Sequence, residues 1–428
     1  MSGPHRVVIL GGGFGGLSAA RSLKHVPVDV TLINRTNYHL FQPLLYQVAT
    51  GALSPANIAS PLRTILKKQK NARVLLAEAT GIDARNRRVI LSDGTVEYDT
   101  LIVATGSSHQ YFGHDEWEDF APGLKTVEDA TDMRRRILLA FETAEREPDA
   151  EKVRALLTFV IVGGGPTGAE LAGALGEIAN DTLRHDFRKI DPSQARIILV
   201  EAADRVLPSY PPSLSAAAER MLERLGVTIR TAHFVTEVGP TGVGVREGDR
   251  SEIIPARTIL WAAGVLASPL GQILSADSGA PLDKSGRVIV EPDCTVPGRP
   301  EIFVIGDLAN FSHQTGEPLP GMAQPAIQQG RYVASVIEKR LRGEKWDRFH
   351  YRDKGNLATL GRGAAIADLN GLRLAGFPAW LIWVFIHLLY IVEFQNRLLV
   401  FIQWGWFYFT YDRSARLITG KSPLPLDI

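Results

Sequence analysis

Two glycine-rich loops, each placed between an apolar stretch and a helical pattern, constrain this chain more than any other feature. In the second copy, the apolar stretch Phe159–Val162 leads into Gly163-Gly-Gly165-Pro-Thr-Gly168, and an Ala/Leu-rich helix is expected from about Pro166. The first glycine allows a tight turn, the second lets the backbone approach a pyrophosphate, and the third lets helix and strand pack closely. The free N–H groups of the helix then bind phosphate. A purely structural glycine turn is the alternative, but the flanking strand and helix favour nucleotide binding.

The first copy lies near the N-terminus. Val7–Leu10 leads into Gly11-Gly-Gly13-Phe14-Gly-Gly16, and a helical pattern follows. Two such units in one chain are much more specific than one, and they are typical of a flavoprotein that takes hydride from a second dinucleotide. The sequence therefore predicts an α/β fold with two Rossmann-like dinucleotide-binding domains, in which the NADH domain is inserted in the FAD domain.

The end of the next predicted strand in the second unit indicates which dinucleotide binds there. The strand Ile197–Val200 ends in Glu201, farther from Gly168 than the usual ~20 residues. A carboxylate at this position accepts both ribose hydroxyls and repels a 2′-phosphate. This favours NADH over NADPH, although Arg205 lies close by in the sequence and could attract a phosphate.

In the first unit the corresponding strand, Val28–Ile33, ends in Asn34 and Arg35 instead of an acid. Asn34 can hydrogen-bond a ribose hydroxyl, and Arg35 can stack on adenine or contact phosphate. We therefore interpret this copy as the FAD site.

Later strand ends add further candidates. The predicted strands ending in Ala-Thr-Gly106 and Ala-Ala-Gly264 have small residues where the chain would cross close to a bound cofactor. Glu301–Ile305 leads into Gly306-Asp307, and Asp307 could hydrogen-bond the ribityl chain of FAD or cap the helix that follows. If the chain is helical from Pro325, Gln324 and Gln328 lie one turn apart and could position a carbonyl substrate; a cap and an exposed side chain are the alternative.

Composition narrows the chemistry. The 428 residues suffice for about three domains, and the net charge of +1 gives no reason to expect a nucleic-acid partner. Cys294 is the single cysteine, so the chain cannot form an internal disulfide, a dithiol redox pair or a thiolate metal site; no metal is expected. The charged run Arg134–Arg136 reads as a solvated helix face, and residues 37–51 read as a buried turn packed on the sheet, in which Pro43 limits helix.

The last part of the chain is far more apolar than the rest. Phe377–Val392 and Leu398–Tyr411 are each too short for a spanning helix, and Glu393 and Arg397 separate them. Four of the seven tryptophans fall here, and such enrichment suits a membrane interface. We expect helices that lie in one leaflet; a dimer interface or a core helix pair is the alternative.

Taken together, these motifs resemble those of the type II NADH dehydrogenases. Members of this family are single-subunit NADH:quinone oxidoreductases that contain FAD and do not pump protons. The resemblance covers essentially the whole chain. Its most specific stretches are Phe41-Gln-Pro-Leu-Leu-Tyr46 and Ala323-Gln-Pro-Ala-Ile-Gln-Gln329, and the glycine loops, Ile305-Gly-Asp307 and Leu357–Asp368 support it. It implies transfer of hydride from NADH to FAD and of two electrons onward to a membrane quinone. It also implies a C-terminal region that docks on the membrane, and a homodimer.

The resemblance also implies roles for individual residues. Glu170 matches a glutamate near nicotinamide and flavin; a helix-dipole partner is the alternative. Gln324 and Gln328 match amides of the quinone site, and residues 37–51, including Gln42, should lie near the flavin ring. Ala364 stands where members often carry Lys or Arg. The predicted cofactor-binding residues are Gly11, Gly13, Phe14, Gly16, Asn34, Arg35, Gln42, Gly106, Gly163, Gly165, Gly168, Glu201, Gly264, Asp307 and Gln324.

The predicted domains are residues 1–115 and 269–345 for the two parts of the FAD-binding domain, 116–268 for the crossover and NADH-binding domain, and 346–428 for membrane anchoring and dimerisation. The expected location is the cytoplasmic side of the cell inner membrane, as a peripheral, monotopic enzyme. A sulfide:quinone oxidoreductase or disulfide reductase needs paired cysteines, which this chain lacks. A soluble NADH-dependent flavoprotein reductase and a non-enzymatic NADH-binding redox sensor remain as alternatives.

Overall fold

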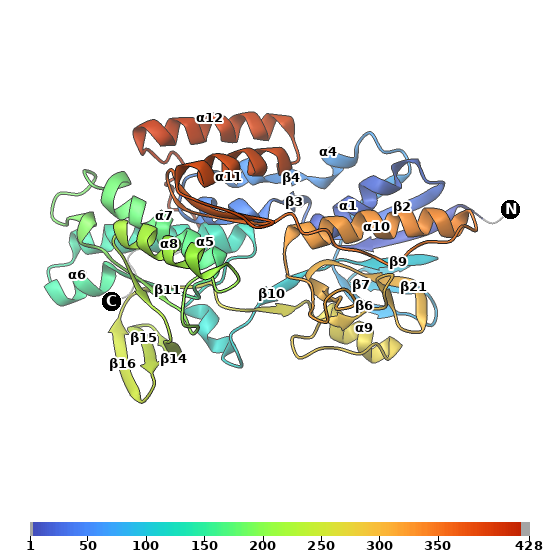
Figure 1. Ribbon diagram of the computed structural model, residues 1–428, viewed down its shortest axis with the longest axis horizontal. Coiled ribbons are helices and arrows are strands. Elements are labelled where there is room, and N and C mark those ends of the chain that lie inside the picture. Colours follow the sequence, from blue (N-terminus) through green and yellow to red (C-terminus); the bar gives the residue numbers. More distant parts are fainter. Residues whose placement is uncertain (1–2, 421–428) are drawn as a thin grey trace. The chain divides into compact units, whose positions relative to one another are not determined.

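The computed structural model describes residues 3–420 and contains two compact units (Figure 1). Unit 1 comprises Met1–Leu40, Ala59–Ser108 and Val265–Asp353. Unit 2 comprises Phe41–Ile58, His109–Gly264 and Lys354–Ile428. This division differs from the boundaries drawn on the sequence, because Phe41–Ile58 and the apolar C-terminal region belong to the same unit as the second glycine loop.

Unit 1 is built on a six-stranded sheet in the order β20-β21-β9-β1-β2-β5. All neighbouring strands are parallel except β20, which runs antiparallel to β21. In β1, Val7–Leu10 are all buried, as expected for a central parallel strand covered on both faces. The strands are β1 (His5–Leu10), β2 (Val28–Asn34), β5 (Ala72–Leu76), β9 (Thr100–Val103), β20 (Thr295–Val296) and β21 (Arg299–Val304).

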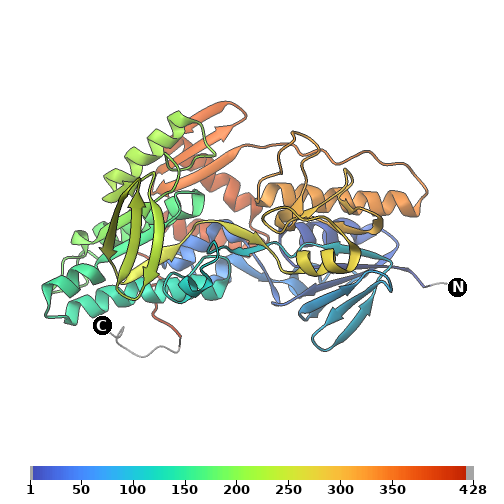
Figure 2. The same ribbon diagram turned by 90° about the horizontal axis from the view of Figure 1, so that it is seen from below.

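Helices α1 and α10 pack closely against one another in unit 1 (Figure 1). A Cβ atom at Gly330 of α10 would lie 2.3 Å from the carbonyl oxygen of Gly15 in α1, so this approach requires glycine. A separate antiparallel sheet, β6-β7-β8, completes the unit (Figure 2). The other elements of unit 1 are α1 (Phe14–Ser22), β3 (Tyr38–Leu40), β4 (Ala59–Pro61), α4 (Leu62–Leu66), β6 (Ala79–Asp83), β7 (Arg88–Leu91), β8 (Gly94–Glu97), β18 (Val265–Ala267), α9 (Leu270–Ser278), β19 (Val288–Ile289), β22 (Ala309–Asn310) and α10 (Ala323–Leu341). Strand β10 (Ser107–His109) leads out of unit 1.

Unit 2 contains a four-stranded parallel sheet in the order β13-β12-β11-β17 and two three-stranded antiparallel sheets, β14-β15-β16 and β23-β24-β25. The parallel strands are β11 (Thr158–Val162), β12 (Arg196–Val200), β13 (Val227–Arg230) and β17 (Thr258–Trp261). The antiparallel strands are β14 (Phe234–Gly239), β15 (Gly242–Glu247), β16 (Arg250–Pro255), β23 (Asn356–Gly361), β24 (Ala364–Leu369) and β25 (Leu372–Ala375). The helices are α2 (Leu45–Ala49), α3 (Pro55–Ile58), α5 (Val127–Arg146), α6 (Ala150–Leu156), α7 (Pro166–Glu177), α8 (Pro212–Arg224), α11 (Phe377–Tyr390) and α12 (Phe394–Thr410).

The C-terminal sheet of unit 2, β23-β24-β25, packs on helix α7 through β23. A Cβ atom at Gly173 would lie 2.1 Å from the carbonyl oxygen of Leu360 in β23, so glycine lets the strand lie directly on the helix. Helices α11 and α12 lie side by side (Figure 1). Within residues 3–420, no helix has both the length and the apolar character needed to cross a membrane.

Two local predictions need correction. Arg134 is buried, not solvated: its guanidinium donates to the carbonyl oxygen of Ala415 (3.1 Å) and to the Thr419 hydroxyl (3.3 Å), so it holds the C-terminal segment. The stretch after Phe41 is buried as expected but contains helix α2. Pro43 is compatible with it because it lies in the first turn of the 3-10 helix Gln42–Leu44. Helix α2 packs on α5 and α7, not on a sheet.

Candidate active site

The first glycine of each loop has the same strained conformation in both units. Gly11 has φ of +103° and Gly163 has φ of +104°, which residues with a side chain rarely adopt. A Cβ atom would also collide with the neighbouring strand end, 2.3 Å from the oxygen of Ala104 and 2.7 Å from the carbonyl carbon of Ala262. Each turn is therefore possible only with glycine.

The third glycine of each loop is required by close packing on the first. A Cβ atom at Gly16 would lie 1.9 Å from the carbonyl oxygen of Gly11, and one at Gly168 would lie 1.8 Å from that of Gly163. The two loops therefore share the same turn and the same close contact between their first and third glycines.

The second glycine of each loop faces open space. Apart from the adjoining residues of the chain, no heavy atom of the described residues lies within 4 Å of a Cβ built on Gly13 or Gly165. These residues are the N-caps of α1 and α7, and neither makes a side-chain cap, so the first N–H groups of each helix are open to an anion. Both loops therefore fit a dinucleotide pyrophosphate.

Asn34 holds the first loop in place. Its Oδ1 accepts the N–H of Gly12 at 2.8 Å, while its Nδ2 donates to the carbonyl oxygen and the hydroxyl of Thr36 at 2.8 and 2.9 Å. The amide is thus largely used within the chain, which leaves one lone pair of Oδ1 for a ribose. Arg35 is exposed, and the ring of Phe14 packs edge-on against His39 (5.1 Å between centroids).

Glu201 occupies the equivalent position in the second loop. Its carboxylate accepts the N–H groups of Gly164 (2.5 Å) and Ala203 (2.7 Å). Because a carboxylate offers about four acceptor positions, two remain for a ribose diol. Arg205 pairs with Asp204 and also donates to the carbonyl oxygen of Pro208 (3.2 Å).

The strand ends of unit 1 bring Asp307 to Ser107. The Ser107 hydroxyl donates to the Asp307 carboxylate at 3.0 Å, and Asp307 does not cap the short helix that contains it. Gly106, beside this pair, has φ of +70° and open space at its Cβ position. The sequence reading missed Gln329, whose Oε1 accepts the N–H of Gly306 (2.8 Å) and fixes the turn that presents Asp307.

The two glutamines of α10 differ in what they leave free. Gln328 makes two hydrogen bonds to the backbone of Arg352, one from its Nε2 (2.9 Å) and one to its Oε1 (3.0 Å), so its amide is engaged. The buried Oε1 of Gln324 has no hydrogen-bond partner in the described part of the chain. Of the predicted pair, Gln324 is thus the residue with an unused polar atom.

Unit 2 contains two further predicted site residues, Gln42 and Gly264, and also Ala364, which stands where members of the family often carry Lys or Arg. Gln42 donates to the carbonyl oxygen of Lys125 (3.0 Å). Gly264, with φ of +73°, lies against the ring of Phe112. Ala364 lies at the start of β24, where its carbonyl oxygen accepts a hydrogen bond from the Thr359 hydroxyl (3.2 Å).

Glu170 lies in the first turns of α7, beneath β23. Burial raises the pKa of its carboxyl well above the ordinary value, and a hydrogen bond from the backbone of Thr359 offsets this only in part. The carboxyl is therefore held in its neutral form above the pH at which a glutamic acid normally ionises, and it can act as a proton donor.

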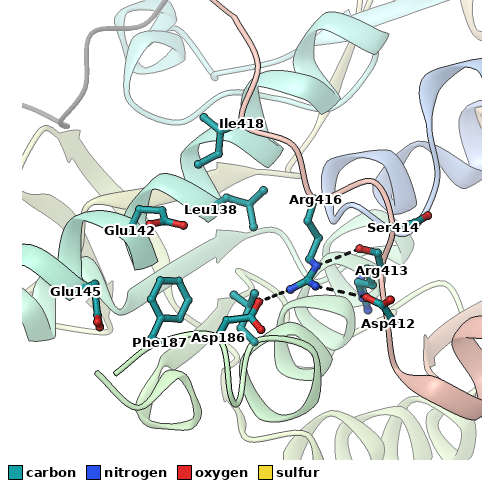
Figure 3. Close-up of a pocket in the computed structure, with 11 residues that line it drawn as sticks. Leu138, Glu142, Glu145, Asp186, Phe187, Asp412, Arg413, Ser414, Arg416 and Ile418 are labelled. Carbon is teal, nitrogen blue, oxygen red and sulfur yellow. Dashed lines mark hydrogen bonds and ion pairs between the residues drawn. The ribbon is translucent and has the colours of Figure 1, made fainter. Parts of the chain in front are cut away.

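A cavity of unit 2 lies elsewhere (Figure 3). It has a volume of about 570 Å³ and lies among α5, the loop after α7 and the segment after α12. Arg416 crosses it and pairs with Asp186 (2.5 Å) and Asp412 (3.4 Å). None of the predicted site residues lines it. Within residues 3–420, no cluster of three or more His, Cys, Asp or Glu side chains is arranged to hold a metal ion.

A repeated pyrophosphate loop on two parallel sheets defines a flavoprotein of the two-dinucleotide class. In agreement, residues 5–330 match the family described as pyridine nucleotide-disulphide oxidoreductase. The chain is 47% identical to the type II NADH:quinone oxidoreductase NdhA of Mycobacterium tuberculosis, over 98% of this chain and 91% of that protein. It is 45% identical to the Ndh protein of the same organism, over 97% and 91%. The chain belongs to the type II NADH:quinone oxidoreductases.

Solved structures agree on the fold. The chain is similar to NDH2 from Plasmodium falciparum in complex with NADH, with a TM-score of 0.87 at 20% identity, over 97% of this chain and 100% of that one. The sulfide:quinone oxidoreductase of Aquifex aeolicus is also similar, with a TM-score of 0.74 at 18% identity and 92% of each chain covered.

Proposed function

We infer that this protein oxidises NADH by means of a bound FAD and passes two electrons to a quinone, without pumping protons. The observation that carries this is the duplicated loop with two different residues at its second strand end, Asn34 in one unit and Glu201 in the other. The identity to type II NADH:quinone oxidoreductases over nearly the full chain points to the same reaction.

We assign FAD to unit 1 and NADH to the Rossmann sheet of unit 2. In this assignment, residues 1–115 and 269–345 bind FAD and residues 116–268 bind NADH, as the sequence predicts. Gly11, Gly13 and Gly16 would receive the FAD pyrophosphate, and Asp307 its ribityl chain. When bound, FAD supplies the acceptor for the hydride and the donor of electrons to the quinone. Gly163, Gly165 and Gly168 would receive the NADH pyrophosphate, and Glu201 its adenosine ribose. The choice of Glu201 rests on the two acceptor positions that its backbone partners leave open.

Glu170 and Gln324 are the proposed catalytic residues. The neutral carboxyl of Glu170 would hold a proton for the quinone, and the unused Oε1 of Gln324 supports a role in positioning a polar substrate. Gln328 would act through the loop that it clamps at Arg352, because its own amide is occupied.

We propose that α11 and α12 attach the protein to the cytoplasmic face of the cell inner membrane as a monotopic homodimer. The proposal rests on a set of large apolar side chains that are exposed on these two helices: Phe377, Leu381, Phe385, Leu389, Phe394, Leu398, Leu399, Phe401, Ile402, Trp406 and Phe409. A surface of this kind is costly in water and suits the interface of a bilayer, where a lipophilic quinone is dissolved.

Anaerobic flavin spectroscopy tests the reaction. Mixing the purified protein with NADH should bleach the flavin absorbance, and a short-chain quinone added afterwards should restore it. A flavin that NADH reduces but that quinone leaves reduced would overturn the quinone assignment, whereas a flavin that NADH does not reduce would overturn the whole proposal.

A further inference from the structure

A chain of three buried side chains joins α12 to α2 in unit 2. The indole Nε1 of Trp404 donates to the Oε1 of Gln47 at 2.7 Å, and the Nε2 of Gln47 donates to the hydroxyl oxygen of Tyr46 at 2.8 Å. All three side chains are at most 8% exposed. Polar groups buried to this extent keep one arrangement, because breaking either hydrogen bond would leave a group without a partner.

The donor and acceptor roles in these two hydrogen bonds follow from the chemistry of the three side chains. An indole N–H can only donate, so the atom of Gln47 that faces Trp404 must be its oxygen. The NH₂ group of Gln47 must then face Tyr46, and the phenol oxygen must accept. The hydroxyl hydrogen of Tyr46 is therefore free to be donated to a third group, and in residues 3–420 this hydroxyl makes no second hydrogen bond.

The surroundings of Tyr46 indicate where its hydrogen is used. Helix α2 packs on α7, which carries Glu170, and burial raises the pKa of Tyr46 well above the ordinary value. The phenol thus remains protonated and able to donate. At its other end the hydrogen-bonded chain starts on α12, one of the two helices with the exposed apolar face through which a lipophilic substrate would enter.

We propose that the Tyr46 hydroxyl donates a hydrogen bond to a carbonyl oxygen of the bound quinone, and that Trp404 and Gln47 orient it for this contact. The inference rests on the proposed function and adds a substrate-contacting residue to it. Tyr46 is the donor to the substrate; Gln47 and Trp404 are positioning residues, because they act through the phenol.

The test compares Tyr46→Phe, Trp404→Phe and the double variant, with Trp383→Phe as the matched control. Trp383 is as buried as Trp404 and contacts it with tilted rings at 5.0 Å between centroids, but its N–H makes no hydrogen bond within the described residues. Tyr46→Phe should lower kcat/KM for a short-chain quinone roughly three- to tenfold, the usual effect of one neutral hydrogen bond. NADH-driven flavin reduction and the flavin absorbance spectrum should not change.

The positioning role makes a sharper prediction. Trp404→Phe should lower quinone kcat/KM by roughly two- to fivefold in the wild-type background and have no effect in the Tyr46→Phe background, because it acts only through the phenol. Trp383→Phe should have no effect in either background. Equal effects of Trp404→Phe in both backgrounds, or a loss in Trp383→Phe as large as in Trp404→Phe, would overturn the positioning role.

A changed flavin spectrum or slower flavin reduction in Tyr46→Phe would overturn the quinone contact, since the phenol would then serve the flavin. Unchanged quinone kinetics in Tyr46→Phe, with a wild type that reduces quinone normally, would overturn this inference alone. A wild type that does not reduce quinone would overturn both it and the proposed function.

Discussion

At the scale of single residues, Asn34 and Glu201 occupy equivalent positions in the two loops, and we propose that they give these loops different tasks. Each accepts an N–H of its own glycine loop, from Gly12 and Gly164 respectively. The Nδ2 of Asn34 donates both of its hydrogens to Thr36, whereas the carboxylate of Glu201 has a negative charge and lone pairs that are not used within the chain. The loop geometry is thus shared, and we propose that the chemistry of the side chain at this one position selects the dinucleotide.

Glu201→Gln should therefore weaken the preference for NADH. The amide keeps an acceptor for Gly164 but loses the charge that repels a 2′-phosphate, so we expect the ratio of kcat/KM for NADPH over NADH to rise roughly tenfold, the equivalent of about 1.4 kcal/mol. Steady-state kinetics with both nucleotides measure this. Asp204→Asn, which removes the neighbouring exposed carboxylate, should leave the ratio as it is; equal changes in both variants would point to general electrostatics.

Glu170→Gln should separate the two halves of the reaction. We expect flavin reduction by NADH to be retained and quinone turnover to fall roughly 10²-fold, a typical contribution of general acid catalysis. Wild-type quinone turnover should also decline as the pH rises through the raised pKa of Glu170, since the proton is then lost, and the variant should lack this decline. Stopped-flow and steady-state measurements over a pH series test it, and unchanged flavin reduction together with unchanged quinone turnover would contradict the assigned role.

The same pKa shift predicts an effect on stability. The folded state binds the Glu170 proton up to a higher pH than the unfolded state, in which the carboxyl titrates near 4.5. The free energy of unfolding of the wild type should thus fall, relative to Glu170→Gln, as the pH rises from 4.5 to the raised pKa. Denaturant unfolding of both proteins across this interval measures the difference, and parallel curves would contradict a raised pKa.

At the scale of elements, one buried ion pair fastens the segment after α12 to α7. The guanidinium of Arg413 pairs with Glu177 at 2.7 Å and also donates to the carbonyl oxygen of Thr50 at 3.1 Å. The side chains of Arg413 and Glu177 are only 2% and 6% exposed. The backbone N–H of Arg362 completes the set by donating to the other oxygen of Glu177.

Arg413→Met should destabilise the protein by about 3–5 kcal/mol, because it leaves the Glu177 carboxylate buried without its cation. Adding Glu177→Gln should recover a large part of this loss, since the uncompensated charge is then gone. Chemical denaturation of the two variants and the wild type measures their free energies of unfolding. A double variant no more stable than Arg413→Met would show that the pair contributes through packing alone.

The elements differ in how far the sequence determines them. The turns at Gly11 and Gly163 could be predicted because the turn and the close contact of its first and third glycines depend on residues a few positions apart. The burial of Arg134 could not, because its partners Ala415 and Thr419 are remote in the chain. The occupied amide of Gln328 depends likewise on the path of the loop at Arg352, which no local pattern reveals.

At the scale of the whole molecule, we propose that two short helices, α11 and α12, hold this redox protein at a membrane surface. Phe385 of α11 is 63% exposed and Phe409 of α12 is 82% exposed. Burial of a phenylalanine side chain contributes about 1.5–3 kcal/mol, so the whole apolar face can hold the protein at a lipid surface without a spanning segment.

Phe385→Glu combined with Phe409→Glu should reduce binding to phospholipid vesicles at least about tenfold, since two apolar contacts are replaced by charges. NADH oxidation with a short-chain, water-soluble quinone should be unaffected. Vesicle co-sedimentation measures the binding. Phe234→Glu is the matched control, because Phe234 is an exposed phenylalanine of β14 in the same unit, and it should bind like the wild type. Equal vesicle binding by all three proteins would favour a protein interface on this face.

Steady-state oxidation of NADH and of NADPH by the purified protein, each with and without a soluble quinone, tests whether this protein is an NADH:quinone oxidoreductase. We propose that Glu201 selects NADH as the donor and that quinone is the acceptor, and we therefore expect a clear preference for NADH and a strong stimulation by quinone. Equally slow oxidation of both nucleotides, with no response to quinone, would contradict this proposal.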